Sequence, residues 1–141
     1  MASSSMEESM EGIRQFLEKD QFARQVGIEL LEVGMGRARA RLRISEQHLN
    51  GVGIAHGGAI FTLADFVFAA ASNSHDTVAV AINVSISYLK AISSGILLAE
   101  AQEVALNPKL ASYTVHVRDE SDDIVAIFQG MAYRKKDRLQ S

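Results

Sequence analysis

The spacing of apolar and polar residues changes along the chain, and each change predicts a new element. Residues 1–5 have low complexity and are expected to be disordered. Residues 6–19 carry apolar side chains at helical spacing behind a capping box of Ser5 and Glu8. This pattern predicts a short amphipathic helix that packs against the rest of the protein.

Two short strands are expected next. Residues 28–33 form an apolar run, and the glycines at 34–36 predict a turn. Residues 37–44 then alternate strictly between arginine and an apolar residue, which is the period of a strand with one solvated face. A row of arginines can hold phosphates, but charge on an edge strand also prevents aggregation, and we interpret the row in this second way.

The segment that follows is a glycine-rich loop that leads into the most apolar helix of the chain, which ends near Ser72. From residue 59 to residue 71 the side chains that are not apolar are those of Thr62 and Asp65. A helix that is apolar on all sides is buried. Because burial of an unpaired carboxylate costs free energy or raises its pKa, Asp65 requires a specific explanation.

The second half of the chain predicts strands. Residues 77–89 carry the longest alternation, with one face assigned to the core and a small, mildly polar face left for solvent or a second subunit. The core face comprises Val78, Val80, Ile82, Val84, Ile86 and Tyr88. Further strands are expected at 96–106, 110–118 and 124–134, with a basic tail from Arg134 to Arg138.

The order of these elements is one helix, two strands, a buried helix and four strands in hairpin connections. Helices and strands that segregate in this way indicate an α+β fold. We expect an antiparallel sheet of about six strands wrapped around one long central helix. We divide the chain into an N-terminal tail and short helix at 1–20, one domain at 21–136 and a C-terminal tail at 137–141.

Composition excludes several classes of function. The net charge of -3 gives no general attraction to nucleic acid or to anionic membranes, and the absence of cysteine rules out a thiol nucleophile. No apolar run is long enough to span a bilayer, and the four histidines lack the spacing of a metal site. We therefore expect a cytoplasmic protein without a metal, a nucleic-acid partner or a membrane partner.

The chemistry of the central segment follows from two features. Gly57 and Gly58 stand at a helix start, where free backbone N–H groups favour an oxyanion. Asp65 could act as a base or a nucleophile. It lies eight residues after Gly57, which is ~12 Å along a helix axis. One subunit's Gly57 and its own Asp65 therefore cannot reach one carbonyl, so we predict a site shared between two subunits.

Residues 49–65, L-N-G-V-G-I-A-H-G-G-A-I-F-T-L-A-D, resemble the motif of hotdog-fold acyl-CoA thioesterases, in particular the phenylacetyl-CoA thioesterases of phenylacetate degradation. The resemblance extends over residues 22–134. It implies a sheet wrapped around a helix, edge-to-edge homodimers that often join into homotetramers, and an acyl-CoA thioester as substrate without a cofactor.

The resemblance also implies roles for individual residues. Asp65 would be the general base or nucleophile, Gly57 the oxyanion donor, Asn50 the residue that orients the thioester or water, and His56 the support of the loop and of the substrate carbonyl. Some relatives place a Ser or Thr on the long strand where this chain has Ala81. The expected substrate-binding residues are Gly58, Phe61, Thr62, Asn83, Ser85 and Lys90.

Two functions remain open at this stage. The first is hydrolysis of aryl-acetyl-CoA or medium-chain acyl-CoA. The second is a non-catalytic acyl-CoA-binding module that acts as a sensor or carrier. A hotdog hydratase is disfavoured because it would require a different arrangement of histidine and acid.

Overall fold

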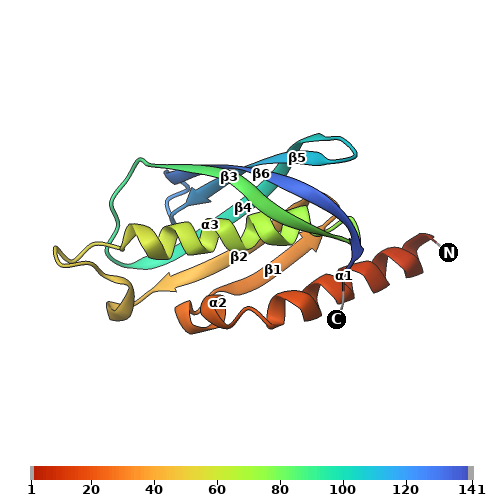
Figure 1. Ribbon diagram of the computed structural model, residues 1–141. Coiled ribbons are helices and arrows are strands. Elements are labelled where there is room, and N and C mark those ends of the chain that lie inside the picture. Colours follow the sequence, from red (N-terminus) through yellow and green to blue (C-terminus); the bar gives the residue numbers. More distant parts are fainter. Residues whose placement is uncertain (1, 140–141) are drawn as a thin grey trace.

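A computed structural model describes residues 2–139 (Figure 1). Its helices are α1 (Ala2–Glu18), α2 (Gln21–Val26) and α3 (Gly57–Ser72), with a short 3-10 turn at Glu46–His48. Its strands are β1 (Glu29–Gly34), β2 (Arg37–Ile44), β3 (Thr77–Tyr88), β4 (Gly95–Leu106), β5 (Leu110–Arg118) and β6 (Ile124–Arg138).

The six strands form one antiparallel sheet in the order β1-β2-β4-β5-β6-β3, and this sheet curves around α3 (Figure 1). The predicted α+β class and the central helix are confirmed. The prediction of four strands in successive hairpins is wrong for β3, which pairs with β6, while β4 pairs with β2 and β5. The segment after β3 therefore crosses from one edge of the sheet back to its middle.

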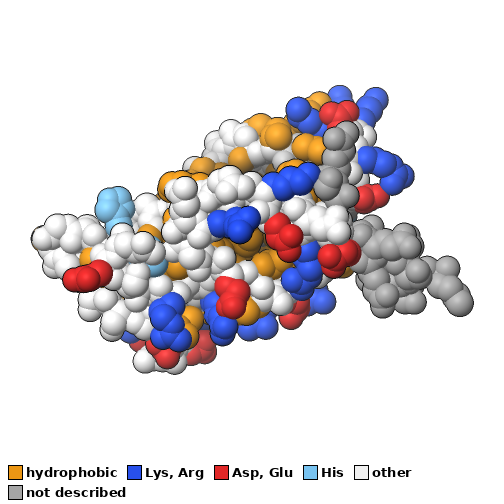
Figure 2. Space-filling view, turned by 90° about the horizontal axis from the view of Figure 1, so that it is seen from below, with side chains coloured by type: hydrophobic (Ala, Val, Ile, Leu, Met, Phe, Trp, Pro, Cys, Tyr) orange, Lys and Arg blue, Asp and Glu red, His pale blue; other side chains and the backbone are white. Residues whose placement is uncertain are grey.

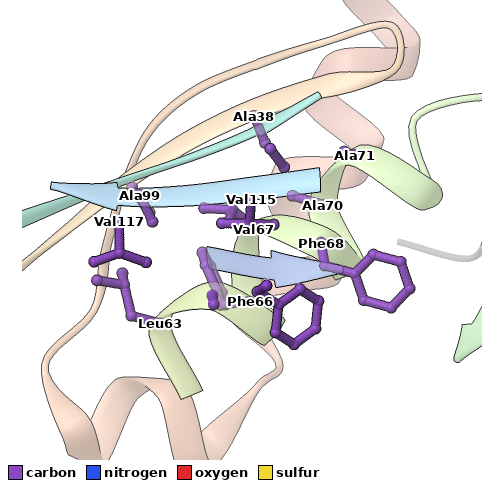
Figure 3. Close-up of a cluster of buried hydrophobic side chains, with 14 of the residues drawn as sticks. Ala38, Leu63, Phe66, Val67, Phe68, Ala70, Ala71, Ala99, Val115 and Val117 are labelled. Carbon is purple, nitrogen blue, oxygen red and sulfur yellow. The ribbon is translucent and has the colours of Figure 1, made fainter. Parts of the chain in front are cut away.

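The core lies between α3 and the concave face of the sheet (Figure 3). Phe68 packs against Tyr113 and Phe128, with ring centroids 5.7 and 5.5 Å away. Gly130 leaves the space for this ring, because a Cβ there would stand 2.8 Å from Phe68. Each large apolar side chain buried here contributes ~1.5–3 kcal/mol to stability. Most of α3 is buried against the sheet, whereas a stripe along Phe61, Thr62, Asp65 and Ala69 stays partly exposed although it is largely apolar.

Strand β3 departs from its predicted faces. The pairing with β6 shifts between Ala81 and Asn83, so Ile82 is the extra residue of a β-bulge. A bulge reverses which face the following residues occupy. Val84 and Ile86 accordingly pack on the core, whereas Val80 and Ile82 are 39% and 54% exposed. The assignment of all six apolar residues to one core face is therefore wrong.

Strand β2 alternates as predicted, with its alanines, Leu42 and Ile44 buried. The interpretation of its arginine row as protection of an edge is wrong, because β2 lies between β1 and β4. Arg37, Arg39 and Arg41 instead form ion pairs across to β1. Arg37 bonds Glu32 and Arg41 bonds Glu29, each at 2.6 Å.

The two ends of the chain are more regular than the sequence predicts. Helix α1 begins at Ala2 rather than Met6, and β6 continues through the expected tail to Arg138. The side chains of the predicted capping box, Ser5 and Glu8, lie outside the described residues. Helix α2 was not predicted, although Asp20 and Gly27 are its N-cap and its left-handed C-cap. The division at 1–20, 21–136 and 137–141 stays a prediction.

Candidate active site

The start of α3 leaves one backbone donor available. His56 caps the helix, because its Nδ1 accepts the Gly58 N–H at 2.8 Å. The His56 carbonyl accepts the N–H groups of Ala59 and Ile60 at 3.0 and 3.3 Å. Among residues 2–139, the Gly57 N–H meets no protein acceptor. Gly57 therefore presents the free donor at the positive end of a helix dipole.

The loop before α3 is organised by Asn50. Its Oδ1 accepts the N–H groups of Val52 and Ile54 at 3.0 and 3.2 Å, and its own N–H donates to the Ile54 carbonyl at 2.8 Å. The Asn50 Oδ1 is thus committed to the loop. Its amide NH₂ remains as the group that can face a ligand.

A cleft of about 360 Å³ opens at this end of α3. Its lining residues are Asn50, Ile54, Ala55, Gly57, Ile60, Tyr88, Leu89, Lys90, Ala91 and Ile92. The Tyr88 hydroxyl donates to the Gly57 carbonyl at 2.9 Å, and burial raises the pKa of Tyr88. Asn50, Gly57 and Lys90, three of the predicted site residues, line this one cleft. The sequence analysis assigned Tyr88 to the core and so missed its contact with the helix start.

Lys90 is less free than a phosphate-binding lysine would be. Its ammonium donates to Asp119 and Asp123 at 2.5 and 2.7 Å, and the hydrogen bond to Asp119, followed by the bond to Asp123, raises its pKa. Coenzyme A phosphates would have to compete with these two carboxylates. The predicted substrate contact of Lys90 stays a prediction.

Asp65 is half-buried in α3, and none of the hydrogen bonds recorded for the described residues reaches its carboxylate. Burial raises its pKa, and the negative charge of Asp20 raises it further. Helix α3 is uninterrupted between Gly57 and Asp65, so the two remain ~12 Å apart along its axis. Asp65 is also absent from the lining of the cleft at Gly57. A single subunit therefore does not bring the two groups together.

The other predicted residues lie elsewhere. Thr62 donates to the Gly58 carbonyl at 2.7 Å within the helix, and Phe61 packs edge-on against Phe128 at 5.6 Å. Asn83 and Ser85 line a different cleft of about 400 Å³. That cleft is on the outer face of the sheet, since their β6 partners alternate with the core-facing Phe128 and Gly130. The roles of these residues, and of His56, stay predictions.

Within residues 2–139, no three His, Cys, Asp or Glu side chains gather closely enough to hold a metal ion. None of the helices in that part of the chain has the length and apolar character needed to cross a membrane.

Comparison with known proteins decides the family. The model of the thioesterase superfamily matches residues 52–126, which include Gly57 and Asp65. The chain belongs to the thioesterase superfamily. This thioesterase domain is 33% identical to the acyl-coenzyme A thioesterase PaaI of Escherichia coli over 118 residues, which cover 83% of this chain and 84% of that protein.

The structural comparison agrees. The structure of the E. coli PaaI protein from the phenylacetic acid degradation operon superimposes with a TM-score of 0.89 at 28% identity, covering 94% of this chain and 96% of PaaI. A Streptococcus mutans protein solved with acetyl-CoA matches with a TM-score of 0.76 at 26% identity, covering 79% and 91%. These likenesses confirm the hotdog fold and the expected family of acyl-CoA thioester hydrolases.

Proposed function

We propose that this thioesterase hydrolyses acyl-CoA thioesters with an aryl-acetyl or medium-chain acyl group, at sites that two subunits share. The observation that carries the proposal is the pair of half-sites on α3. The free Gly57 N–H opens onto a cleft, and the half-buried Asp65 lies ~12 Å further along the same helix. Two antiparallel copies of α3 would place each Asp65 near the other subunit's Gly57.

The reaction follows from these groups. The substrate carbonyl oxygen accepts the Gly57 N–H of one subunit, which stabilises the negative charge that develops in the tetrahedral intermediate. The partner subunit's Asp65 either takes a proton from water as the water attacks, or attacks the carbonyl carbon itself to form a mixed anhydride that water then hydrolyses. In both routes the carbon–sulfur bond breaks, and the products are a free acid and the coenzyme A thiol.

The exposed edge of the sheet supports the dimer. Strand β3 is an edge strand of twelve residues, and it carries the exposed apolar side chains of Val80 and Ile82. An edge of this length and character invites pairing with another strand. Edge-to-edge pairing of two β3 strands is the arrangement we propose, with two such dimers joined as a homotetramer in the cytoplasm. The resemblance to PaaI supports a role in phenylacetate degradation.

A thiol-release assay with a panel of acyl-CoAs tests this function. We expect turnover of phenylacetyl-CoA or of medium-chain acyl-CoA, and loss of that turnover in the variant Asp65→Asn. Tight binding of acyl-CoA without release of thiol from any member of the panel would contradict hydrolysis and favour a sensor or carrier.

A further inference from the structure

Two ring side chains hold a single peptide unit at the start of α3, the unit between Gly57 and Gly58. Its carbonyl, which belongs to Gly57, accepts the Tyr88 hydroxyl at 2.9 Å. Its N–H, which belongs to Gly58, donates to Nδ1 of His56 at 2.8 Å. The free Gly57 N–H lies on the preceding peptide unit and is joined to the held unit through the Cα of Gly57. The two side chains therefore fix the direct neighbour of the free donor.

The pair of glycines leaves the space for these two rings. A Cβ on Gly57 would stand 3.1 Å from the Tyr88 ring and hydroxyl, and a Cβ on Gly58 would stand 3.0 Å from Nδ1 of His56. Both distances are shorter than ordinary van der Waals contact, so a larger residue at either position would push the ring away. The atoms nearest to each missing Cβ belong to the same two side chains that make the hydrogen bonds.

A helix that starts with two glycines needs such support. Glycine adopts backbone conformations that other residues avoid, and the first N–H groups of a helix have no partner within the helix. Without the two side-chain hydrogen bonds, Gly57 and Gly58 would sample several orientations, and some of these would turn the Gly57 N–H away from a ligand. Holding the adjacent peptide removes this loss before the substrate binds.

Tyr88 is a firm support because it stands on the sheet. It is the last residue of β3 and pairs with Ala126 of β6, and the N–H of the next residue, Leu89, donates to the Val125 carbonyl at 2.8 Å. Burial raises the pKa of Tyr88, so its hydroxyl keeps the proton that it donates to the Gly57 carbonyl. The hydroxyl thus ties the flexible start of α3 to a paired strand.

The direction of the Gly57 N–H matters because a dipole, and not a free cation, meets the substrate in this cleft. Among the lining residues Lys90 carries the positive charge, and its ammonium is already bound by Asp119 and Asp123. Seen from below, the left end of the molecule, which carries the loop before α3, shows largely uncharged surface, whereas charged side chains gather over the middle (Figure 2). Stabilisation of an oxyanion by a dipole is largest when the dipole is oriented in advance.

We infer that Tyr88 is a positioning residue for hydrolysis, which together with His56 clamps the Gly57–Gly58 peptide and so keeps the Gly57 N–H directed at the substrate carbonyl. The inference rests on the proposed function, because Tyr88 acts through the proposed oxyanion donor. Loss of the Tyr88 hydroxyl should then slow the chemical step and leave substrate binding nearly as it was.

Tyr88→Phe removes the hydroxyl and keeps the ring. A hydrogen bond of ordinary strength corresponds to about three- to ten-fold in rate, so we expect kcat for thiol release to fall by this factor while KM stays within about two-fold of the parental value. Tyr133→Phe is the matched control, because Tyr133 is a similarly exposed tyrosine, 41% against 50%, that does not line the cleft. It should keep the parental kcat. A folded Tyr88→Phe protein with the parental kcat would overturn the inference.

The route through the Gly57 N–H is tested in two backgrounds. Gly57→Ala and Gly57→Pro place the same Cβ beside Tyr88, but the alanine keeps the N–H and the proline does not. Tyr88→Phe should lower kcat further in the Gly57→Ala protein and leave kcat of the Gly57→Pro protein unchanged. An equal loss in both backgrounds would show that Tyr88 acts in another way, such as by touching the substrate, and would overturn the positioning role.

A measurement without substrate separates this inference from the proposed function. In ¹⁵N relaxation of the ligand-free protein, the order parameters of the Gly57 and Gly58 amides should lie near the rigid value of about 0.85 in the parent and in Tyr133→Phe, and should be lower in Tyr88→Phe. A parent that hydrolyses no thioester would contradict the proposed function, and these order parameters would then decide whether the clamp exists. Equal values in the parent and in Tyr88→Phe would overturn it.

Discussion

Replacement of Gly57 by proline isolates the contribution of one backbone N–H. Proline has no N–H, and it is well tolerated at the first position of a helix, which is where Gly57 stands. The preceding residue must be extended, and His56 already has φ -62° and ψ 134°. The variant therefore removes the proposed oxyanion donor while the backbone of α3 is retained.

The expected effect is large for a single group. Loss of one oxyanion donor costs ~10²–10³ in kcat, about 2.7–4 kcal/mol of transition-state stabilisation. The new Cβ also meets the Tyr88 ring carbon and hydroxyl at 3.1 Å, so the half-exposed Tyr88 has to shift by a few tenths of an ångström. Gly57→Ala introduces the same Cβ and keeps the N–H, and it thereby separates the contact from the hydrogen bond.

The assay is steady-state thiol release for both variants, with circular dichroism to verify folding. We expect Gly57→Pro to lose kcat by two to three orders of magnitude relative to Gly57→Ala, with a smaller change in KM. Equal kcat values for the two folded variants would refute the role of the Gly57 N–H.

Three further predictions concern charge and packing. Asp65→Asn should lower kcat by ~10²–10⁴ and raise the unfolding temperature at neutral pH. The stability gain arises because the pKa of Asp65 in the folded protein lies above its ordinary value of 3.8, so the charged carboxylate destabilises the fold at neutral pH. The gain should shrink as pH falls through the interval between the folded and ordinary pKa values and vanish below pH 3.8. An unchanged unfolding temperature at neutral pH would contradict this reasoning. Asp20→Asn keeps the cap on the Ala23 N–H but removes a charge that raises the pKa of Asp65. The acid limb of the pH profile of kcat/KM should therefore move to lower pH. An unmoved limb or an upward shift would argue against this coupling. Gly130→Ala should lower the free energy of unfolding, measured by urea denaturation, by about 1–3 kcal/mol, because the new Cβ meets Phe68. Gly12→Ala is the control and should not destabilise the fold, because there is open space around Gly12. Equal effects of the two substitutions would contradict the packing account.

The sequence predicts those helices and strands whose pattern of apolar and polar residues is uninterrupted over their whole length. Strand β5 was predicted with its true bounds because its alternation is uninterrupted. Helix α3 was predicted nearly so by a different signal, a run that is apolar on all sides after a pair of glycines. The reversal of faces in β3 could not be predicted, since a bulge at Ile82 leaves no mark in an alternation of small and apolar residues. The position of β2 inside the sheet depends on pairing between distant strands, which local pattern does not encode.

The site divides in the same way. Gly57, Asn50 and Asp65 were predictable because a helix start, a turn residue and a charge in an apolar helix are local signals. Tyr88 was missed, since its contact with the Gly57 carbonyl joins residues 31 apart in sequence. The influence of Asp20 on Asp65 likewise depends on the docking of α2 beside α3.

The claim that each site belongs to two subunits is tested most directly by mixing two inactive variants. Asp65→Asn and Gly57→Pro chains are unfolded together in equal amounts, refolded and assayed for thiol release. With random pairing, about half of the dimers contain one chain of each variant, and one of the two sites in each such dimer combines an intact Asp65 with the partner's intact Gly57. About a quarter of the parental activity should therefore return. A mixture no more active than the two variants refolded separately would contradict the shared site and place both groups within one subunit.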